Sequence, residues 1–298
     1  MFSIWEQNSF SRYDIVILGG GIVGLSTAYF IKQKYPSQRV LILERGILPS
    51  GASTKNAGFA CMGSASELLN DLKTMSEQEV IALFMLRKKG LERLRRLLGD
   101  IAIGYQANGS YELIQKHELE VLERLPYLNH LLRSELSKEA FREAKSTVNT
   151  SGFDGRQVHS MIQNTCEGEI DTGWMMRNLT DLTLQQGIEI KTGCKVIHFH
   201  ESSKEVQLDI QNPIGTEIIT LFASKLFVCT NAFASTLVPD LDITPGRGQV
   251  LITKPIQHLP FKGIFHFDQG YYYFRAYRGC VLLGGGHNLA MEKETTLE

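Results

Sequence analysis

Residues 13–24 read YDIVILGGGIVG, and this stretch decides the fold of the chain. Its first six residues form a short, β-branched, apolar run typical of a buried strand, and three glycines follow at once. Apolar residues then recur at helical spacing over Ile22–Lys34. A second apolar run, Val40–Leu43, ends at Glu44 and Arg45. Two strands joined by a helix of this length predict a parallel β-α-β unit with a right-handed crossover.

The glycines have the spacing G-x-G-x-x-G, at Gly19, Gly21 and Gly24. The first permits a tight turn, the second lets the backbone approach a pyrophosphate, and the third lets helix and strand pack closely. N–H groups of the first helical turn, which contains Ile22 and Val23, would then face the phosphates. Because the motif lies where a strand passes into a helix, it favours a Rossmann-type dinucleotide site over an ordinary glycine-rich turn.

Glu44 lies 20 residues after Gly24, at the end of the second strand. A carboxylate in this place can accept hydrogen bonds from the two ribose hydroxyls of a dinucleotide, and it would repel a 2′-phosphate. NAD and FAD present the same ADP portion to such a motif, so the motif alone leaves both cofactors open.

A second loop follows a few residues later, Gly51–Gly58, with the sequence GASTKNAG. It is rich in small residues and backbone donors, which suits a loop that passes close to a second phosphate or a flat ring. The same composition is also common in polar surface loops.

Composition excludes several classes of function. The 298 residues are 43% hydrophobic and can bury the core of one large or two medium domains. Thirty-one basic and 32 acidic residues give a net charge of -1, so we expect no nucleic-acid partner. The five cysteines contain no C-x-x-C pair and the histidines no ligand spacing, so no metal site is expected. Without a membrane-length apolar run or a signal peptide, a cytoplasmic location is expected.

Seven stretches together carry a family resemblance: IVILGGGIVGLSTAYF, LILERG, GASTKNAGFA, GEIDTGWMMRNL, VCTNAFASTLVP, PGRGQV and YYYFRAYRGCVLLGGG. In this order the chain resembles the FAD-dependent amine and amino-acid oxidoreductases, the superfamily of D-amino-acid oxidase, glycine oxidase, sarcosine oxidase and D-amino-acid dehydrogenase. The resemblance runs from about residue 13 to 290. It implies FAD rather than NAD as the cofactor.

The resemblance also implies roles for matching positions. The glycines would face the FAD pyrophosphate, Glu44 the adenosine ribose, the second loop the flavin, and the backbone of Val196 the adenine, while residues 230–232 return to the pyrophosphate. The cofactor-binding residues expected in this way are Gly19, Gly21, Ile22, Val23, Gly24, Glu44, Arg45, Ser53, Thr54, Lys55, Asn56, Ala57, Gly58, Val196, Thr230, Asn231 and Ala232.

In this superfamily the flavin accepts a hydride at N5, so the protein mainly has to hold the substrate and exclude water. For a substrate carboxylate, Arg275 is the first candidate clamp and Arg247 the second, since guanidinium binds carboxylates in a bidentate fashion. A structural ion pair is the alternative for each. Tyr271 and Tyr273 share one strand face and Tyr272 takes the other. One tyrosine of this run, with Tyr272 as the candidate, is expected to face the substrate, and the others to pack in the sheet.

These observations predict an α/β protein in which a Rossmann-type FAD-binding domain is interleaved with a β-rich α+β substrate domain. The first would comprise residues 13–62 and about 145–235, and the second, with a helical insertion, about 63–144 and 236–298. Family members usually continue for several tens of residues beyond the GGG segment, so we expect that the C-terminal part of the family's fold is missing from this chain.

The expected function is oxidation of a small amine or amino acid by hydride transfer to flavin N5. A 2-hydroxy acid as substrate and a non-catalytic flavin-fold binding module are the alternatives. The oligomeric state is left open by the sequence.

Overall fold

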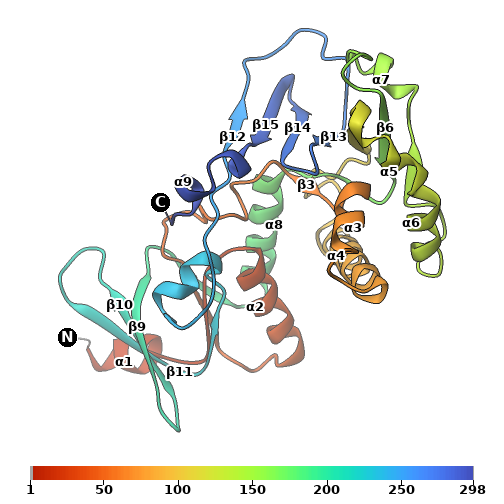
Figure 1. Ribbon diagram of the computed structural model, residues 1–298. Helices are drawn as coiled ribbons and strands as arrows, with labels where there is room; N and C mark the ends of the chain where they lie inside the picture. The colour runs from red at the N-terminus through yellow and green to blue at the C-terminus, as the bar shows by residue number, and fades with distance from the viewer. Residues whose placement is uncertain (1–2, 298) are drawn as a thin grey trace. The chain divides into compact units, whose positions relative to one another are not determined.

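The computed structural model describes residues 3–297, which divide into two compact units (Figure 1). Each unit is assembled from segments that are far apart in the sequence. Of the described residues, the first unit comprises 3–55, 173–246 and 295–297, and the second comprises 56–172 and 247–294. The expected interleaving of two domains along the chain is therefore confirmed.

The first unit is built on a six-stranded sheet with the strand order β8-β2-β1-β11-β10-β9. Strand β1 pairs in parallel with β2 and β11, β2 pairs in parallel with β8, and β10 is antiparallel to β11 and β9. The strands are β1 Arg12–Leu18, β2 Val40–Leu43, β8 Glu189–Lys191, β9 Lys195–Glu201, β10 Val206–Gln211 and β11 Ile218–Val228.

The helices of this unit include α2, which covers Ile22–Lys34 as predicted and closes the parallel β1-α2-β2 unit. Buried apolar side chains of β1, β2, β10 and β11, such as Val16, Leu41 and Leu208, form the core. The other helices are α1 Ile4–Phe10, the 3₁₀ helix η2 Asn231–Thr236 and nearly all of α8 Thr172–Gln185.

Strand β11 pairs with two different neighbours along its length. Its first half pairs with β10 and its second half with β1. A single strand therefore joins the parallel and antiparallel parts of the sheet.

The second unit contains a seven-stranded sheet with the order β12-β15-β14-β13-β4-β6-β5, in which only β13 and β4 pair in parallel. The strands β3 and β7 form a separate antiparallel pair. The bounds are β3 Phe59–Ala60, β4 Ser110–Ile114, β5 Phe141–Glu143, β6 Ser160–Asn164, β7 Gly168–Glu169, β12 Val250–Ile252, β13 Ile264–Phe267, β14 Tyr272–Tyr277 and β15 Cys280–Gly285.

Helices α3, α4 and α6 of the second unit lie together (Figure 1) and pack with Ile114 and Ile162 of the sheet around Phe84 and Leu128. A capping box formed by Ser76 and Glu79 begins α4. The helices are α3 Ala65–Asp71, α4 Glu77–Leu98, η1 Lys116–Glu118, α5 Glu120–Glu123, α6 Leu125–Leu132, α7 Thr147–Thr150, η3 His287–Leu289 and α9 Met291–Glu294.

The unit boundaries differ from those predicted. Residues 145–172 were placed with the dinucleotide-binding segments, but they belong to the second unit because β6 pairs with β4 and β5. Residues 56–62 belong there as well, since β3 pairs with β7. Residues 236–246, in contrast, belong to the first unit.

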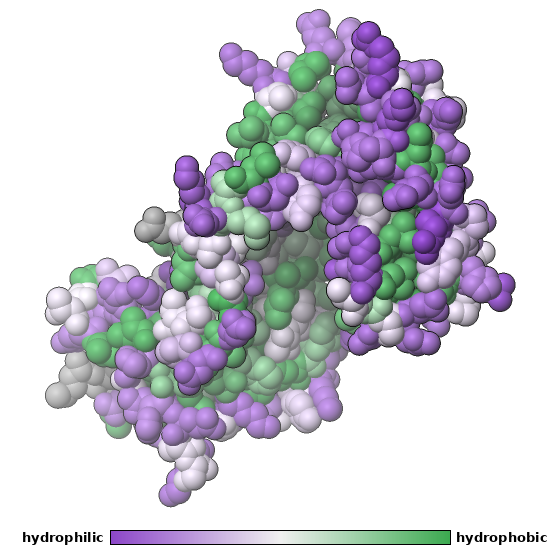
Figure 2. Space-filling view, viewed as in Figure 1, coloured by the Kyte–Doolittle hydropathy of each residue, from purple (hydrophilic) through white to green (hydrophobic). Residues whose placement is uncertain are grey.

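The surface of the second unit is largely hydrophilic in the view of Figure 2, with hydrophobic side chains among the polar ones. Its edge strand β12 exposes three apolar residues, Val250, Leu251 and Ile252. Within residues 3–297, no helix is long and apolar enough to cross a membrane.

Candidate functional site

The glycine turn, residues 19–24, has no room for side chains at two of its positions. Gly19 has a φ of +103°, and a Cβ atom there would lie 2.5 Å from the carbonyl oxygen of Cys229, at the end of β11. A Cβ atom on Gly24 would lie 1.9 Å from the carbonyl oxygen of Gly19. These glycines therefore let the ends of β1 and β11 and the start of α2 come into backbone contact.

The Glu44 carboxylate contacts this turn directly. Its Oε2 atom accepts a hydrogen bond of 2.8 Å from the N–H of Gly20, and its Oε1 atom accepts one of 2.8 Å from the N–H of Gly46. The acid that the sequence singled out thus lies beside the glycine turn, at the carboxyl ends of β1 and β2.

The start of α2 contacts the first part of the second loop. The N–H of Ile22 donates to Ser53 Oγ at 3.0 Å, and the next residue of the helix, Val23, is exposed. The Thr54 hydroxyl donates instead to the Pro49 carbonyl at 2.6 Å, within its own loop, and Lys55 is exposed. Of these loop residues, Ser53 is the one that the structure brings to the glycine turn.

The end of β11 holds a buried polar atom without a partner. Thr230 Oγ1 is buried and makes no hydrogen bond with the described residues. Asn231 follows with a φ of +51°, which is uncommon for a residue other than glycine, and Ala232 is half-buried in η2. Together these residues turn the chain sharply beside the glycine turn.

Two further predicted residues, Arg45 and Val196, contact apolar side chains of the first unit. The Arg45 guanidinium lies 3.6 Å from the centre of the Phe233 ring. Val196, on β9, is half-buried and packs against the core of the unit.

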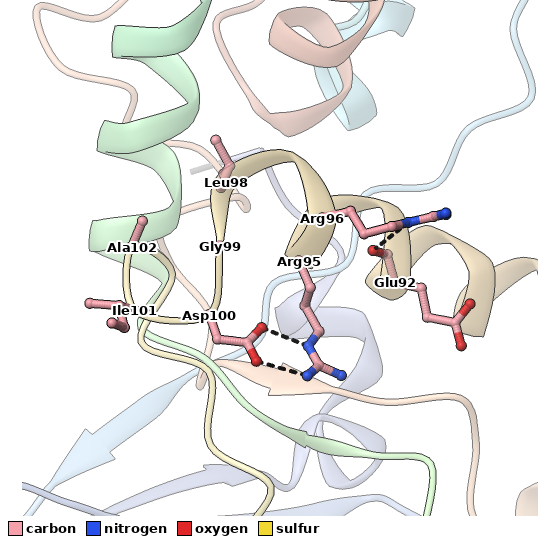
Figure 3. Close-up of a pocket in the computed structure, with 8 residues that line it drawn as sticks. All are labelled: Glu92, Arg95, Arg96, Leu98, Gly99, Asp100, Ile101 and Ala102. Atoms are coloured by element: carbon pink, nitrogen blue, oxygen red, sulfur yellow. Dashed lines mark hydrogen bonds and ion pairs between the residues drawn. The ribbon is translucent and has the colours of Figure 1, made fainter.

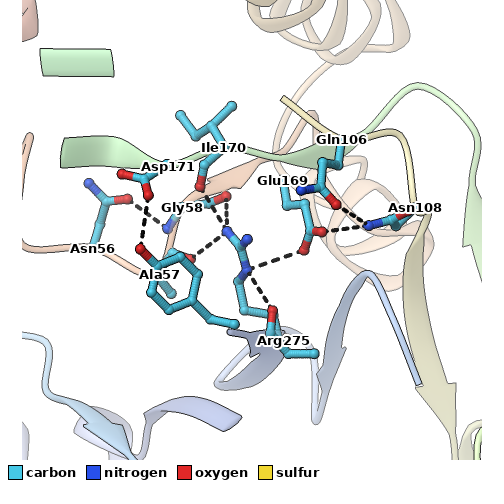
Figure 4. Close-up of polar contacts among 11 residues, drawn as sticks. Asn56, Ala57, Gly58, Gln106, Asn108, Glu169, Ile170, Asp171 and Arg275 are labelled. Atoms are coloured by element: carbon cyan, nitrogen blue, oxygen red, sulfur yellow. Dashed lines mark hydrogen bonds and ion pairs between the residues drawn. The ribbon is translucent and has the colours of Figure 1, made fainter. Parts of the chain in front are cut away.

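The last three residues of the predicted second loop belong to the second unit (Figure 4). Asn56 Oδ1 accepts a hydrogen bond of 2.9 Å from the N–H of Gly58, and Ala57 and Gly58 are buried. The carbonyl oxygens of Ala57, Gly58 and Ile170 all accept hydrogen bonds from Nη1 of Arg275, at 3.2, 3.0 and 2.8 Å.

The environment of Arg275 corrects its predicted role as a substrate clamp. The residue is 5% exposed, and its Nε atom lies 3.2 Å from Glu169 Oε2. Burial lowers the pKa of Arg275, and the charge of Glu169 opposes that shift. The guanidinium therefore binds groups inside the protein. The alternation of side chains along β14 directs Arg275 toward the β3–β7 pair, as it does Tyr273 and Tyr277.

The other two substrate candidates lie elsewhere. Tyr272 is on the opposite face of β14 and stacks on Phe267 with 5.1 Å between ring centres. The Nε atom of Arg247 donates to Glu294 Oε2 at 2.8 Å, in an exposed ion pair. Since Tyr272 and Arg275 occupy opposite faces of one strand, the structure does not bring these two candidates together.

A buried polar cluster, Ser110, Glu112, Glu167 and His266, was missed by the sequence analysis. Glu167 Oε1 accepts hydrogen bonds from the N–H groups of Met62 at 2.5 Å and Gly63 at 2.9 Å. Three atoms, Ser110 Oγ, Glu167 Oε2 and His266 Nε2, are buried without a hydrogen-bond partner among the described residues.

Burial raises the pKa of both Glu112 and Glu167, and the nearby His266 opposes each shift. The one signal in the sequence was Glu112, a charged residue between Tyr111 and Leu113 of strand β4.

A surface pocket opens at the C-terminal end of α4 (Figure 3), where Arg95 binds Asp100 through two hydrogen bonds of 2.7 and 2.8 Å. It contains none of the predicted site residues. The pocket is lined by Glu92, Arg95, Arg96, Leu98, Gly99, Asp100, Ile101 and Ala102.

Comparison with known proteins decides the family. The family model described as FAD dependent oxidoreductase matches residues 14–297. The chain belongs to this family. An L-2-hydroxyglutarate dehydrogenase from an Escherichia coli strain is 26% identical over 310 aligned positions, which cover 95% of the chain and 65% of that relative. The chain thus spans about two thirds of the length of this relative.

Solved structures show the same fold. Glycine oxidase from Geobacillus kaustophilus superimposes with a TM-score of 0.68 and 19% identity, over 93% of this chain and 71% of that one. Dithionite-reduced L-α-glycerophosphate oxidase from Mycoplasma pneumoniae with FAD bound gives a TM-score of 0.69 and 16% identity, over 93% and 72% of the two chains. The sequence-based recognition of this FAD-dependent family is confirmed, and FAD is the cofactor of the family.

Proposed function

We propose that the first unit binds the ADP portion of FAD at the carboxyl ends of β1, β2 and β11. The observation that carries this proposal is the hydrogen bond of 2.8 Å between Glu44 and the N–H of Gly20, within a turn where side chains are absent. Ligands of parallel sheets bind at the carboxyl ends of the strands. The buried, unpaired Thr230 Oγ1 lies at the same ends and supports a polar ligand there.

The residues present fit this group. Helix α2 begins at Ile22, and its N-cap residue Gly21 has no side chain that could cap it, so the positive end of the helix, next to Ser53, suits the pyrophosphate. Each Glu44 oxygen accepts one backbone hydrogen bond and keeps a further lone pair for a ribose hydroxyl. Bound FAD would supply the hydride acceptor, while the protein holds the substrate and excludes water.

For the substrate we propose a small amino acid or 2-hydroxy acid. The hydroxyglutarate dehydrogenase relative, aligned with nearly the whole chain, supports a hydroxy acid. The fold shared with glycine oxidase is compatible with an amino acid, although a fold does not fix a function. In both classes the oxidised C–H bond lies next to a carboxylate. Arg247 and Tyr272 remain the candidates to contact that substrate.

Reconstitution with FAD tests the cofactor proposal. The purified protein is titrated with FAD, and bound flavin is measured by its absorption and by quenching of its fluorescence. Glu44→Ala should weaken binding at least about tenfold, since two hydrogen-bond acceptors are lost. Glu201→Ala, an exposed acid of β9 in the same unit, should bind as the wild type does.

Anaerobic mixing with substrates tests the reaction. Glycine, sarcosine, longer amino acids and 2-hydroxy acids are each added to the FAD-loaded protein, and bleaching of the flavin is followed. Fast bleaching by one class identifies the substrate class. Stable flavin binding without reduction by any of these compounds would favour the non-catalytic binding module instead.

A further inference from the structure

A group of polar side chains lies on one buried face of the second unit's sheet. Strand β13 pairs in parallel with β4, so that His266 lies beside Glu112, and Ser110 lies two residues earlier on β4. Because alternate residues of a strand point to the same face, these three side chains share a face of the sheet. On the other side of β4, Asn164 of β6 is paired with Ser110. The pairing therefore gathers four polar side chains, all of them buried.

The segment of residues 62–66 covers this face and binds most of its polar groups. The N–H groups of residues 62 and 63 donate to Glu167 Oε1 at 2.5 and 2.9 Å, and Asn164 Nδ2 donates to the carbonyl oxygen of residue 63 at 3.0 Å. The N–H of Ser66 donates to Glu112 Oε2 at 3.3 Å, and its hydroxyl donates to the other carboxylate oxygen. The polar atoms that remain without a partner among the described residues are Ser110 Oγ, Glu167 Oε2 and His266 Nε2.

We propose that these three atoms bind one internal water molecule. Ser110, Glu167 and His266 are 0, 3 and 8% exposed, so bulk solvent does not reach them. A buried water molecule typically makes about three hydrogen bonds to polar groups that have no other partner, which matches the atoms left over. Water also fits their mixed chemistry, because it can donate to a carboxylate and accept from a hydroxyl or an imidazole N–H.

The position of His266 supports a bridging molecule. Its imidazole lies near enough to Glu112 and Glu167 to oppose the effect of burial on the pKa of each carboxyl group. His266 Nε2 nevertheless makes no direct hydrogen bond to either carboxyl group. Polar groups that face each other beyond hydrogen-bond distance are commonly bridged by water. Such a bridge would connect β13, through Glu167, to the segment of residues 62–66.

Other kinds of ligand suit this place less well than water does. Within residues 3–297, no group of three or more His, Cys, Asp and Glu side chains has an arrangement that could hold a metal ion. The enclosure of the side chains between the sheet and residues 62–66 leaves no path for a large ligand. The site therefore calls for one small, neutral molecule with both donors and acceptors.

A high-resolution crystal structure of the wild-type protein checks the site directly. We expect one solvent peak at about 2.5–3.2 Å from each of the three atoms. A crystal soaked in rubidium chloride should give no anomalous signal at this peak. A direct hydrogen bond between Glu167 and His266 with no solvent between them would overturn the proposal, and so would a rubidium signal, which would identify a cation site.

Two substitutions of Ser110 test the site in solution. Ser110→Ala removes one partner of the water molecule and should raise the equilibrium constant of unfolding about tenfold. Ser110→Asn adds an amide that can displace the water and supply a donor and an acceptor in its place. For this variant we expect a constant within about threefold of the wild type. The site does not require bound FAD, so the cofactor-free protein can be used.

Ser160 provides the matched control. It is a buried serine of β6 in the same sheet, but its hydroxyl donates directly to Glu143 Oε1 at 2.7 Å. With no water to displace, Ser160→Asn should be overpacked and should destabilise the protein more than Ser160→Ala does. Urea unfolding of the four variants measures both orders. If Asn is more destabilising than Ala at position 110 as well, the water site is refuted, and if neither Ser110 variant folds, the wild-type crystal structure decides.

Discussion

Glu44 Oε2 accepts a hydrogen bond of 2.8 Å from the N–H of Gly20, and this bond joins the end of β2 to the turn between β1 and α2. The other carboxylate oxygen accepts from the N–H of Gly46, which follows β2. One side chain thus organises both backbone segments that border the proposed ribose position. Its structural and binding roles can therefore be separated by measuring the protein with and without FAD.

Replacing Glu44 should affect the two roles differently. Glu44→Ala leaves two N–H groups without their acceptor and should lower the free energy of unfolding of the cofactor-free protein by about 1–3 kcal/mol. Glu44→Gln keeps one acceptor oxygen and should cost less stability. Urea unfolding followed by circular dichroism measures both. Equal stability of Glu44→Ala and wild type would show that neither hydrogen bond matters to the fold.

The contact between Gly24 and Gly19 predicts a strong effect of one methyl group. In Gly24→Ala the new Cβ atom would lie 1.9 Å from the Gly19 carbonyl oxygen, so α2 must move away from β1. We expect a loss of at least about 3 kcal/mol or failure to fold. Gly51→Ala is the control, because no atom lies within 4 Å of its added Cβ. A thermal unfolding temperature for Gly24→Ala equal to that of the control would contradict the close contact.

Local sequence patterns correctly predicted the helix and the second strand at the start of the first unit. Helix α2 and strand β2 have the predicted bounds, because the glycine turn and the apolar runs specify strand, turn and helix within a few residues. Glu44 could be placed beside the glycines because a β-α-β unit has few possible geometries.

Long-range contacts could not be predicted in this way. Arg275 donates hydrogen bonds to two carbonyl groups that lie 217 and 105 residues earlier in the chain. No local sequence pattern distinguishes this buried arginine from one that binds a substrate. Strand β6 was missed, although its pairing with β4 moves residues 145–172 into the second unit. Glu167 lies just before β7, and no local pattern predicts that it is buried near His266, which β13 brings to it.

The crowding at Gly58 predicts a further substitution effect. Gly58→Ala combines a left-handed backbone, at a φ of +74°, with a Cβ atom that would lie 2.3 Å from the Ile170 carbonyl oxygen. Gly279→Ala has a similar φ of +78° but no atom within 4 Å, so it isolates the backbone cost of about 1–2 kcal/mol. We expect Gly58→Ala to lose clearly more stability than Gly279→Ala in urea unfolding. Equal losses would mean that Arg275 and Ile170 move aside at little cost.

The buried Glu167 carboxyl predicts a specific dependence of stability on pH. Burial raises its pKa above the ordinary value of 4.5, against the opposing effects of His266 and of the hydrogen bonds from the N–H groups of residues 62 and 63. Below pH 4.5 the carboxyl is protonated in both folded and unfolded chains, and its contribution to stability is fully present. As the pH rises, the unfolded chain releases the proton first, so stability is lost until the pH passes the folded pKa.

Glu167→Gln removes this titration and keeps an oxygen acceptor for the two N–H groups. Its amide N–H₂ would replace the unpaired Oε2 atom. Relative to wild type, the variant should therefore gain stability between pH 4.5 and 7, by about 1.4 kcal/mol for each unit by which the folded pKa is raised. Urea unfolding at several pH values measures this difference, with the exposed Glu123→Gln as control. A difference from wild type that stays constant over this range would show that Glu167 does not hold its proton more tightly in the folded protein.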